Sequence, residues 1–504
     1  MTIINIINFI RGIEPREAVD LYEPVRQQLQ LLDEHNMTGT FLMQYDAMID
    51  EQFVSMLQST RHEIGCWLEI VEPLCKAAGI PWRGRFPWDW HAHVGFSVGY
   101  SPDERKRLID ALMAKFKSIF GIYPHSVGSW MIDAVSLDYM ASEYGVRASC
   151  NCKDQWGTDG YTLWGGYYGQ AYYPSRTNAY APAQDVAHQI PVPIFKMLGS
   201  DPIYQYDAGL SLKEGATRWQ NVITLEPVYH QNGGGDKAWT KWFFEQVLTG
   251  TCCLTFRYAQ VGQENSFGWP AMAEGLQDQF HYLSQMREQG IVRVETLADS
   301  ATAFSAQYPI TPNAAITALN DWKREDRQSV WFCSKRYRTN LFREKAQLWF
   351  RDLMMFDDAY TERYLDAVCD NPEMVYDNLP IVDGNRWSGN DVRAGLYFNI
   401  HVEDLQVAEK ETELEITVTA REGQVMLRFS DDTIAVTTDI ADLRLEFVWG
   451  QSVEMDAAKV ETKALRLMHE GFAYGVQLTS GVMMGMAMVP EAGSLMMKMV
   501  RMVD

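Results

Sequence analysis

Carboxylate side chains follow the predicted strands of the first 300 residues, at the points where those strands end. Two carboxyl groups that face one glycosidic bond can divide the roles of acid and of nucleophile or base. Crowding them in a partly dry cleft raises the pKa of one group and keeps a proton available near neutral pH. A single carboxylate at such a position can also be a helix N-cap. The residues are Glu14, Glu69, Asp133, Asp154, Glu226 and Glu264, of which Asp133 directly precedes a predicted helix.

A second concentration of polar and aromatic residues lies in segment 82–100, WRGRFPWDWHAHVGFSVGY. Trp88 and Trp90 stand among Pro, Asp and His, where an aromatic face can pack against the C–H bonds of a sugar ring. His91 and His93 are two residues apart, so on an extended segment both face one way and could bind a metal together. The spacing identifies no third ligand. The alternative is that both histidines hydrogen-bond to sugar hydroxyls or to Asp89.

Further candidates for sugar binding lie at other strand ends and in loops. Amide, carboxylate and aromatic groups gathered in loops are what a hydroxyl-rich ligand requires. The candidates are Arg11, Trp67, Trp130, Trp156, Tyr206 and Gln263.

Short apolar strands alternate with helical stretches over the first 300 residues, which predicts a parallel sheet covered by helices. The carboxyl ends of such strands meet at one face of a barrel, where active sites form. The aromatic-rich insertion 151–206 is expected to cover this face, because long loops of that kind usually carry function. Strands are predicted at 3–10, 39–43, 63–70, 126–131, 147–150, 222–225, 253–258 and 292–295, and helices at 17–35, 51–59, 102–120, 136–144 and 270–289.

The pattern changes after residue 310, and beyond 390 short runs alternate apolar and polar residues in the manner of β-strands. We therefore expect an α/β fold in which a (β/α)7-type barrel is followed by a C-terminal β-sandwich. The expected divisions are 1–310 for the barrel, including the insertions 82–100 and 151–206, then 311–390 for a linking region and 391–504 for the sandwich.

Composition excludes several classes of partner. The chain has 66 acidic and 44 basic residues, a net charge of −22, which repels nucleic acids and anionic membranes. No run of apolar residues is long enough to span a membrane, and the N-terminal segment lacks the features of a signal peptide. The eight cysteines lack zinc-site spacing and are expected to be core thiols of a cytoplasmic protein. A homo-oligomer remains open.

Two pieces of sequence resemble the polysaccharide deacetylase/glycoside hydrolase superfamily. One is Thr40-Phe41-Leu42 followed by His62-Glu63-Ile64-Gly65, and the other is segment 128–145, which closes with Glu143-Tyr144-Gly145. The resemblance covers about the first 300 residues. It implies an incomplete (β/α)7 barrel of the kind shared by α-mannosidases and amylopullulanase-type hydrolases.

The same resemblance separates two branches of the superfamily. Deacetylases carry an Asp-Asp pair after strand 1, where this chain has Phe9-Ile10-Arg11-Gly12. Their two metal-binding histidines correspond to Trp67 and Val71 here. The chain therefore resembles the hydrolase branch, whose pattern implies a carboxylate nucleophile at the strand-4 end, which is Asp133 in this sequence.

We expect a glycoside hydrolase that acts on an oligosaccharide or glycoside without a cofactor. Asp133 is the expected nucleophile or base, and Glu264 is the expected acid, ahead of Glu226 and Asp154. One alternative is a metal-dependent carbohydrate enzyme, a divergent deacetylase or α-mannosidase-like hydrolase, that uses His91 and His93 with a divalent ion. The other is a sugar-binding protein without catalytic activity.

Overall fold

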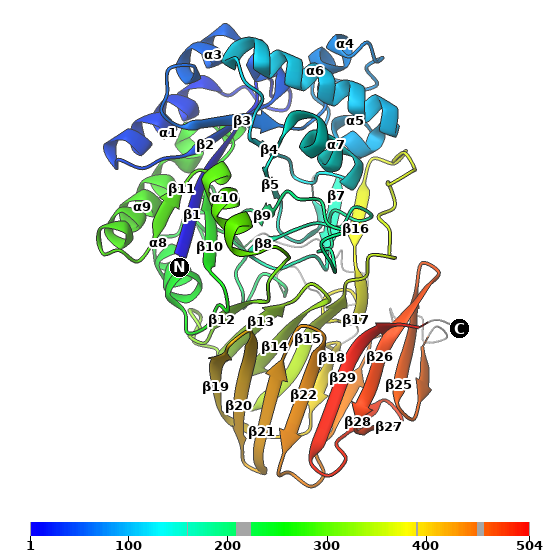
Figure 1. Cartoon of the computed structure of the whole chain (residues 1–504). Helices are drawn as coiled ribbons and strands as arrows, with labels where there is room; N and C mark the ends of the chain where they lie inside the picture. The colour runs from blue at the N-terminus through cyan, green and yellow to red at the C-terminus, as the bar shows by residue number, and fades with distance from the viewer. Residues whose placement is uncertain (1, 159, 208–222, 390–391, 451–457, 503–504) are drawn as a thin grey trace.

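The computed structural model describes residues 2–158, 160–207, 223–389, 392–450 and 458–502. An α/β part, formed by the first 310 residues, lies above two large antiparallel sheets in Figure 1. This arrangement confirms the predicted barrel followed by a β-sandwich. Among the described residues, no helix is long and apolar enough to cross a membrane.

The barrel sheet is curled and incompletely closed, and its parallel strands run in the order β10-β1-β2-β3-β4-β5-β9. All nine residues of β1 are buried, which accounts for its Ile-rich sequence. Its polar residue Asn5 donates to the Glu295 carbonyl (2.9 Å) and to Ser300 Oγ (2.8 Å). The strands are β1 (Thr2–Ile10), β2 (Thr40–Met43), β3 (Glu63–Trp67), β4 (Ser126–Gly128), β5 (Ala148–Asn151), β9 (Ile194–Lys196) and β10 (Arg257–Val261), with β11 (Arg293–Glu295) also beside β1 and β8 (Ala171–Tyr172) antiparallel at the edge.

Helices cover the outside of this sheet (Figure 1). The helix α6 (Pro102–Phe120) has the bounds that its sequence predicts. Ser101 and Glu104 form a capping box at its start, Gly121 ends it with φ of +78°, and its apolar stripe is buried. The other helices of seven or more residues are α1 (Tyr22–Glu34), α3 (Glu51–Leu57), α7 (Ala134–Tyr144), α8 (Lys237–Phe243), α9 (Trp269–Glu288) and α10 (Leu297–Gln307).

The strand beside β5 corrects the sequence-based prediction. We expected it at 222–225, but Val222 lies outside the described residues and Thr224 makes only an isolated bridge to Ser200. The position is taken by β9, which belongs to the predicted insertion. Pro191 and Pro193 precede this short strand and give its sequence the appearance of a loop. The strand predicted at 253–258 lies slightly further along the chain, as β10.

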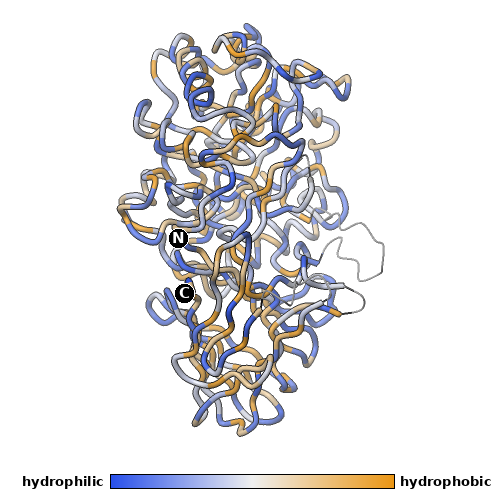
Figure 2. Tube along the Cα trace, turned by 90° about the vertical axis from the view of Figure 1, so that its right-hand side faces the viewer, coloured by the Kyte–Doolittle hydropathy of each residue, from blue (hydrophilic) through white to orange (hydrophobic). Residues whose placement is uncertain are grey.

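Two antiparallel sheets make up the rest of the molecule. Strands from 311–390, expected to be a linking region, belong to the first of these sheets. Alternate residues of β20 are buried, and Figure 2 shows hydrophobic and hydrophilic positions interleaved along these strands. The first sheet contains β12 (Ala314–Ala318), β13 (Arg327–Cys333), β14 (Tyr337–Glu344), β15 (Gln347–Met355), β17 (Leu379–Asp383), β18 (Gly395–Phe398), β23 (Leu445–Val448), β27 (Val482–Met484) and β28 (Ala487–Val489). The second contains β19 (Val402–Lys410), β20 (Glu413–Ala420), β21 (Gly423–Phe429), β22 (Thr433–Thr438), β24 (Lys459–Glu461), β25 (Ala464–His469), β26 (Phe472–Ser480) and β29 (Ser494–Arg501).

A small third sheet joins the two parts of the molecule. β7 (Tyr161–Trp164), within the barrel insertion, pairs with β6 (Gln155–Thr158) and in parallel with β16 (Met374–Asp377). Figure 1 shows β16 reaching up from the sandwich to lie beside β7. The insertion is therefore held between the barrel and the sandwich. All eight cysteines are buried and form no disulfide.

Candidate active site

A cavity of about 570 Å³ opens at the carboxyl ends of the barrel strands. Residues from the loops after six parallel strands line it: Arg11 after β1, Glu69 after β3, Trp130 after β4, Cys152 after β5, Leu198 after β9 and Glu264 after β10. This is the edge where active sites form in barrels of parallel strands. The other lining residues are Glu14, Arg16, Glu17, Trp88, Trp90, Phe96, Gln155, Tyr161, Glu226, Tyr229, Ser266, Phe267 and Ala271.

The structure brings eight of the predicted site residues to this cavity: Arg11, Glu14, Glu69, Trp88, Trp90, Trp130, Glu226 and Glu264. Sequence reasoning missed several others. Arg16 and Glu17 lie in the same loop as Arg11, and Ser266 and Phe267 lie in the same loop as Glu264. The predicted residues of these loops could therefore have pointed to their neighbours. Gln155 and Tyr161 belong to the β6–β7 hairpin, whose fold the sequence of the insertion does not reveal.

Arg11 occupies the centre of the carboxylate cluster. Its Nη2 lies 3.2 Å from Glu69 Oε2 and 3.3 Å from Glu264 Oε2, and its Nη1 lies 3.8 Å from Glu14 Oε2. The Asn265 side chain fixes the backbone of Arg11, accepting from its N–H and donating to its carbonyl, both at 2.9 Å. One buried guanidinium therefore holds three carboxylates that would otherwise repel one another.

Glu69 connects Arg11 to two buried side chains of the barrel core. Its Oε2 accepts from Trp67 Nε1 (3.0 Å) and from Gln44 Nε2 (3.2 Å). Burial raises the pKa of Glu69, and the positive charge of Arg11 opposes that rise. The Trp67 ring is fully buried against Phe9 and is not part of the cavity wall. Trp67 thus orients a carboxylate instead of stacking on a ligand.

Glu226 has neutral hydrogen-bond partners. Thr224 Oγ1 donates to its Oε2 (2.9 Å) and Gln263 Nε2 donates to its Oε1 (3.3 Å). Burial raises the pKa of Glu226, while the charge of the buried Lys153 acts against that rise. Gln263 is itself buried and does not line the cavity. The two donated hydrogen bonds also lower the pKa of Glu226, but the effect of burial is larger, and the net upward shift is the direction that suits a general acid.

Glu264 is held differently from Glu226. Ser266 Oγ donates to its Oε1 at 2.6 Å, and its Oε2 forms the ion pair with Arg11. No hydrogen bond of good geometry reaches that second oxygen from the described residues. Among the described residues Glu264 Oε2 thus pairs only with Arg11, an environment that suits a nucleophile or base better than an acid.

Aromatic rings form the walls of the cavity. Trp130 and Tyr161 are stacked at 6.5 Å between ring centroids, while the face of Trp88 is covered by the guanidinium of Arg11 at 4.0 Å and of Arg16 at 4.7 Å. Two buried donors, Gln155 Nε2 and Trp88 Nε1, have no hydrogen-bond partner among the described residues. Both belong to residues of the cavity lining.

The paired histidines and Asp89 organise the 82–100 loop outside the cavity lining. Arg85 donates to both oxygens of the buried Asp89 (2.9 and 3.2 Å), and His91 Nδ1 lies 2.6 Å from Asp89 Oδ1. The rings of His91 and His93 are 6.0 Å apart. Neither belongs to a group of three metal-ligating side chains; in the described residues only the surface group Asp185, His188 and Asp358 has that geometry.

Asp133 does not line this cavity. It is fully buried as the N-cap of α7 and accepts from the Ser136 backbone N–H at 2.9 Å. Its oxygens also accept from Ser97 Oγ and Ser136 Oγ, both at 2.6 Å, and it forms an ion pair with the fully buried Arg105 at 3.1 Å. Every lone pair is directed to structural partners, so the strand-4 carboxylate stabilises the fold.

Replacing Asp133 by Asn is expected to lower the free energy of unfolding by about 3–5 kcal/mol, because Arg105 then stays buried without its counter-charge. Denaturant unfolding measures this loss. The matched control is Asp138→Asn on the same helix, where the ion pair with Arg176 is exposed and the change should be below about 1 kcal/mol. Turnover per folded molecule should be unchanged in Asp133→Asn; a specific loss of turnover in a stable protein would instead place Asp133 in the chemistry.

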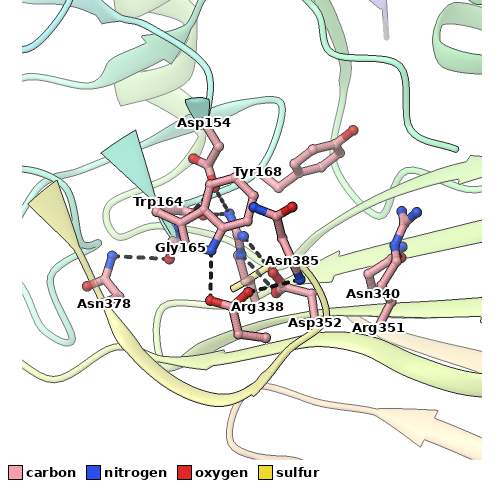
Figure 3. A network of polar contacts seen from close by, with 12 residues as sticks. Asp154, Trp164, Gly165, Tyr168, Arg338, Asn340, Arg351, Asp352, Asn378 and Asn385 are labelled. Carbon is pink, nitrogen blue, oxygen red and sulfur yellow. Dashed lines mark hydrogen bonds and ion pairs between the residues drawn. The ribbon is translucent and has the colours of Figure 1, made fainter. Parts of the chain in front are cut away.

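Asp154 also lies outside the cavity lining, in a buried network between barrel and sandwich (Figure 3). Arg338 on β14 donates to Asp154 Oδ2 (2.5 Å) and to both oxygens of Asp352 on β15 (3.0 and 2.6 Å). Tyr180 donates to the other oxygen of Asp154, and the Gly165 N–H donates to Oδ2 at 2.9 Å. These contacts give Asp154 a structural role.

Trp156 and Tyr206 complete the set of predicted residues, and neither lines the cavity. The Tyr206 ring is buried against Trp331 at 4.6 Å, and Trp156 lies edge-on to Trp164 at 6.1 Å. Both rings pack at the junction between the insertion and the sandwich.

Comparison with known proteins relates the fold to solved structures. No protein-family model and no curated protein matches the sequence. The fold is similar to a crystal structure from Parabacteroides distasonis described as a glycoside hydrolase/deacetylase, with 16% identity, a TM-score of 0.55, and coverage of 78% of this chain and 92% of that one.

Two weaker likenesses are to an allantoinase (13% identity, TM-score 0.39, covering 62% of this chain and 92% of that one) and to a protein from Pseudomonas aeruginosa PAO1 described as a polysaccharide deacetylase (12%, 0.37, 61% and 92%). At the level of fold, the chain shares the α/β barrel of that Parabacteroides distasonis structure, as the sequence predicted.

Proposed function

We propose that the protein is a carbohydrate-acting hydrolase that cleaves a glycosidic bond in the cavity at the barrel mouth. The observation that supports this most is the pairing of two differently held carboxylates, Glu226 and Glu264, in one aromatic-walled cavity. The unpartnered donors Gln155 Nε2 and Trp88 Nε1 add groups that suit sugar hydroxyls. The shared fold of a glycoside hydrolase/deacetylase structure is consistent with the proposal.

In this proposal Glu226 is the acid and Glu264 is the nucleophile or base, in place of the order that the sequence suggested. Glu226 protonates the leaving oxygen, because its raised pKa keeps it protonated at higher pH than an exposed glutamate. Glu264, paired with Arg11, attacks the anomeric carbon or activates the water that does so. Glu69 and Glu14 then serve to hold Arg11 in place.

The residues present do not fit the metal-dependent alternative. Arg11 stands where the deacetylase pattern has acidic ligands, and its guanidinium already neutralises the carboxylates around it. The two histidine positions are Trp67, which donates to Glu69, and Val71, which is apolar and buried. His91 Nδ1 is taken up by Asp89 and Arg85. No step of the proposed reaction is assigned to a metal.

The test is a hydrolysis assay on a panel of oligosaccharides and aryl glycosides in the presence of a chelator, with products identified by mass spectrometry. The proposal expects new reducing ends and unchanged rates with chelator. Release of acetate from N-acetylated sugars without chain cleavage would overturn it in favour of a deacetylase. Sugar binding without any product would overturn it in favour of a binding protein.

The pH profile gives a second test of the acid. Because Glu226 must be protonated, kcat/KM should fall as pH rises through its pKa. Lys153 lowers that pKa, so Lys153→Met should raise it further and move the alkaline limb to higher pH. The exposed Lys241→Met is the control and should leave the limb in place. An unmoved limb in Lys153→Met would exclude Glu226 as the acid.

A further inference from the structure

Negative charge exceeds positive charge around the cavity. Its lining holds the four carboxylates of Glu14, Glu17, Glu69 and Glu264 against the two guanidinium groups of Arg11 and Arg16, and Glu226 adds no charge while it is protonated as the acid. Lys153, buried behind Glu226, offsets one further charge without lining the cavity. The remaining excess is reinforced by the net charge of −22 on the whole chain, and both favour a positively charged ligand.

Both arginines of the lining already have partners. Arg16 donates to both oxygens of Glu14 (2.8 and 2.7 Å), and Arg11 lies between Glu69 and Glu264. A carboxylate or phosphate on a ligand would therefore have to break an existing ion pair to find a cation. An anionic sugar is disfavoured by this arrangement.

One carboxylate, in contrast, remains available. Glu17 is exposed in the lining and takes part in no ion pair within the described part of the chain. The tryptophan walls also attract cations, as the two guanidinium groups over Trp88 demonstrate. A ligand with an ammonium group would gain from each of these features.

A sugar also offers acceptor oxygens to two buried donors of the lining residues. Gln155 is 5% exposed and Trp88 is 2% exposed, and Gln155 Nε2 and Trp88 Nε1 lack partners among the described residues. Hydroxyl or ring oxygens of a sugar would satisfy both. The ligand chemistry that meets all these requirements is a sugar that bears a free amine.

We infer that the cavity selects amino sugars with an unacetylated, protonated amine, and that Glu17 at the rim is a specificity-determining residue for that charge. The inference rests on the proposed carbohydrate-acting function and specifies its substrate class. An ammonium group beside Glu17 and the Arg11–Glu264 pair replaces its hydration with carboxylate and aromatic contacts. An N-acetylated sugar lacks that charge and gains none of these contacts.

Calorimetric titration of the full chain tests this with three ligands of equal length: a glucosamine oligosaccharide, its N-acetylated form and the corresponding glucose oligosaccharide. At pH 6 and low salt the amino form should bind about tenfold more tightly than either neutral form. The advantage should shrink at 1 M salt and above pH 8, as the charge is screened or the amine deprotonates.

Substitution separates the inference from the proposed function. Glu17→Gln should weaken binding of the amino form about threefold and leave the N-acetylated form unchanged. Glu274→Gln, an exposed carboxylate outside the lining, is the control for total charge and should change neither. Equal or tighter binding of the neutral sugars, with hydrolysis observed, overturns the inference alone. Absence of binding to all three sugars overturns the inference and the proposed function together.

Discussion

The Glu264→Gln variant should lose about 10³-fold or more in kcat on every cleavable substrate while it folds normally and still binds sugar. Glutamine keeps the shape of the side chain and its hydrogen bond from Ser266. It removes the carboxylate that pairs with Arg11 and that, in the proposed reaction, attacks the substrate or activates its water. Kinetics on an oligosaccharide and on a nitrophenyl glycoside measure the loss. Glu274→Gln, which changes an exposed carboxylate outside the cavity lining, is the control and should retain turnover.

Glu226→Gln should give a different pattern, which distinguishes the two roles. An acid matters most when the leaving oxygen is basic, so cleavage of an oligosaccharide should fall about 10²–10⁴-fold. Cleavage of a nitrophenyl glycoside, whose leaving group needs no proton, should fall far less. If both variants lose the same factor on both substrates, the assignment of acid and nucleophile is contradicted. If both retain turnover, the cavity is not the catalytic site.

The second large effect is expected on stability. Arg338→Met should lower the free energy of unfolding by about 3–5 kcal/mol or more, because Asp154 and Asp352 remain buried without their common cation (Figure 3). Denaturant unfolding followed by tryptophan fluorescence measures it. Arg428→Met is the matched control: its ion pairs with Glu413 and Glu415 are exposed, and its loss should stay below about 1 kcal/mol.

The stability loss in Arg338→Met should depend on pH with a defined sign. Burial raises the pKa of Asp352 to about 6 even beside Arg338, and removal of the cation raises it further. A carboxyl group whose pKa is higher in the folded state than in the unfolded state destabilises the fold as pH rises through that range. The variant should therefore be least stable at pH 7–8 and regain stability towards pH 5. A pH-independent loss would contradict the charge-based explanation.

Regular elements could be predicted from the sequence because local signals agreed with the global fold. In α6, the capping box at Ser101, the apolar stripe and the terminal Gly121 all indicate the same helix, and its bounds are confirmed. The strand β9 shows the opposite case. The prolines before it are typical of a loop, and its pairing partner, β5, lies far away in the sequence.

The candidate site could be located from the sequence more readily than its roles could be assigned. Arg11, Glu69 and Glu264 follow strand ends and line one cavity, since the carboxyl ends of parallel strands converge. The direction of a side chain is a tertiary property, however. Asp133 follows its strand as Glu264 does. Its side chain, however, is buried in an ion pair with Arg105 of α6 and does not reach the cavity.

The most direct test of the central claim is a crystal structure of Glu264→Gln with a bound amino-sugar oligosaccharide. The account predicts that the sugar lies in the cavity lined by Trp88, Trp130 and Gln155, with a glycosidic oxygen within about 3 Å of a Glu226 oxygen. Residue 264 should lie on the opposite side of the anomeric carbon from Glu226. A sugar bound only to the sandwich, or one in the cavity with no glycosidic oxygen near Glu226, would contradict the account.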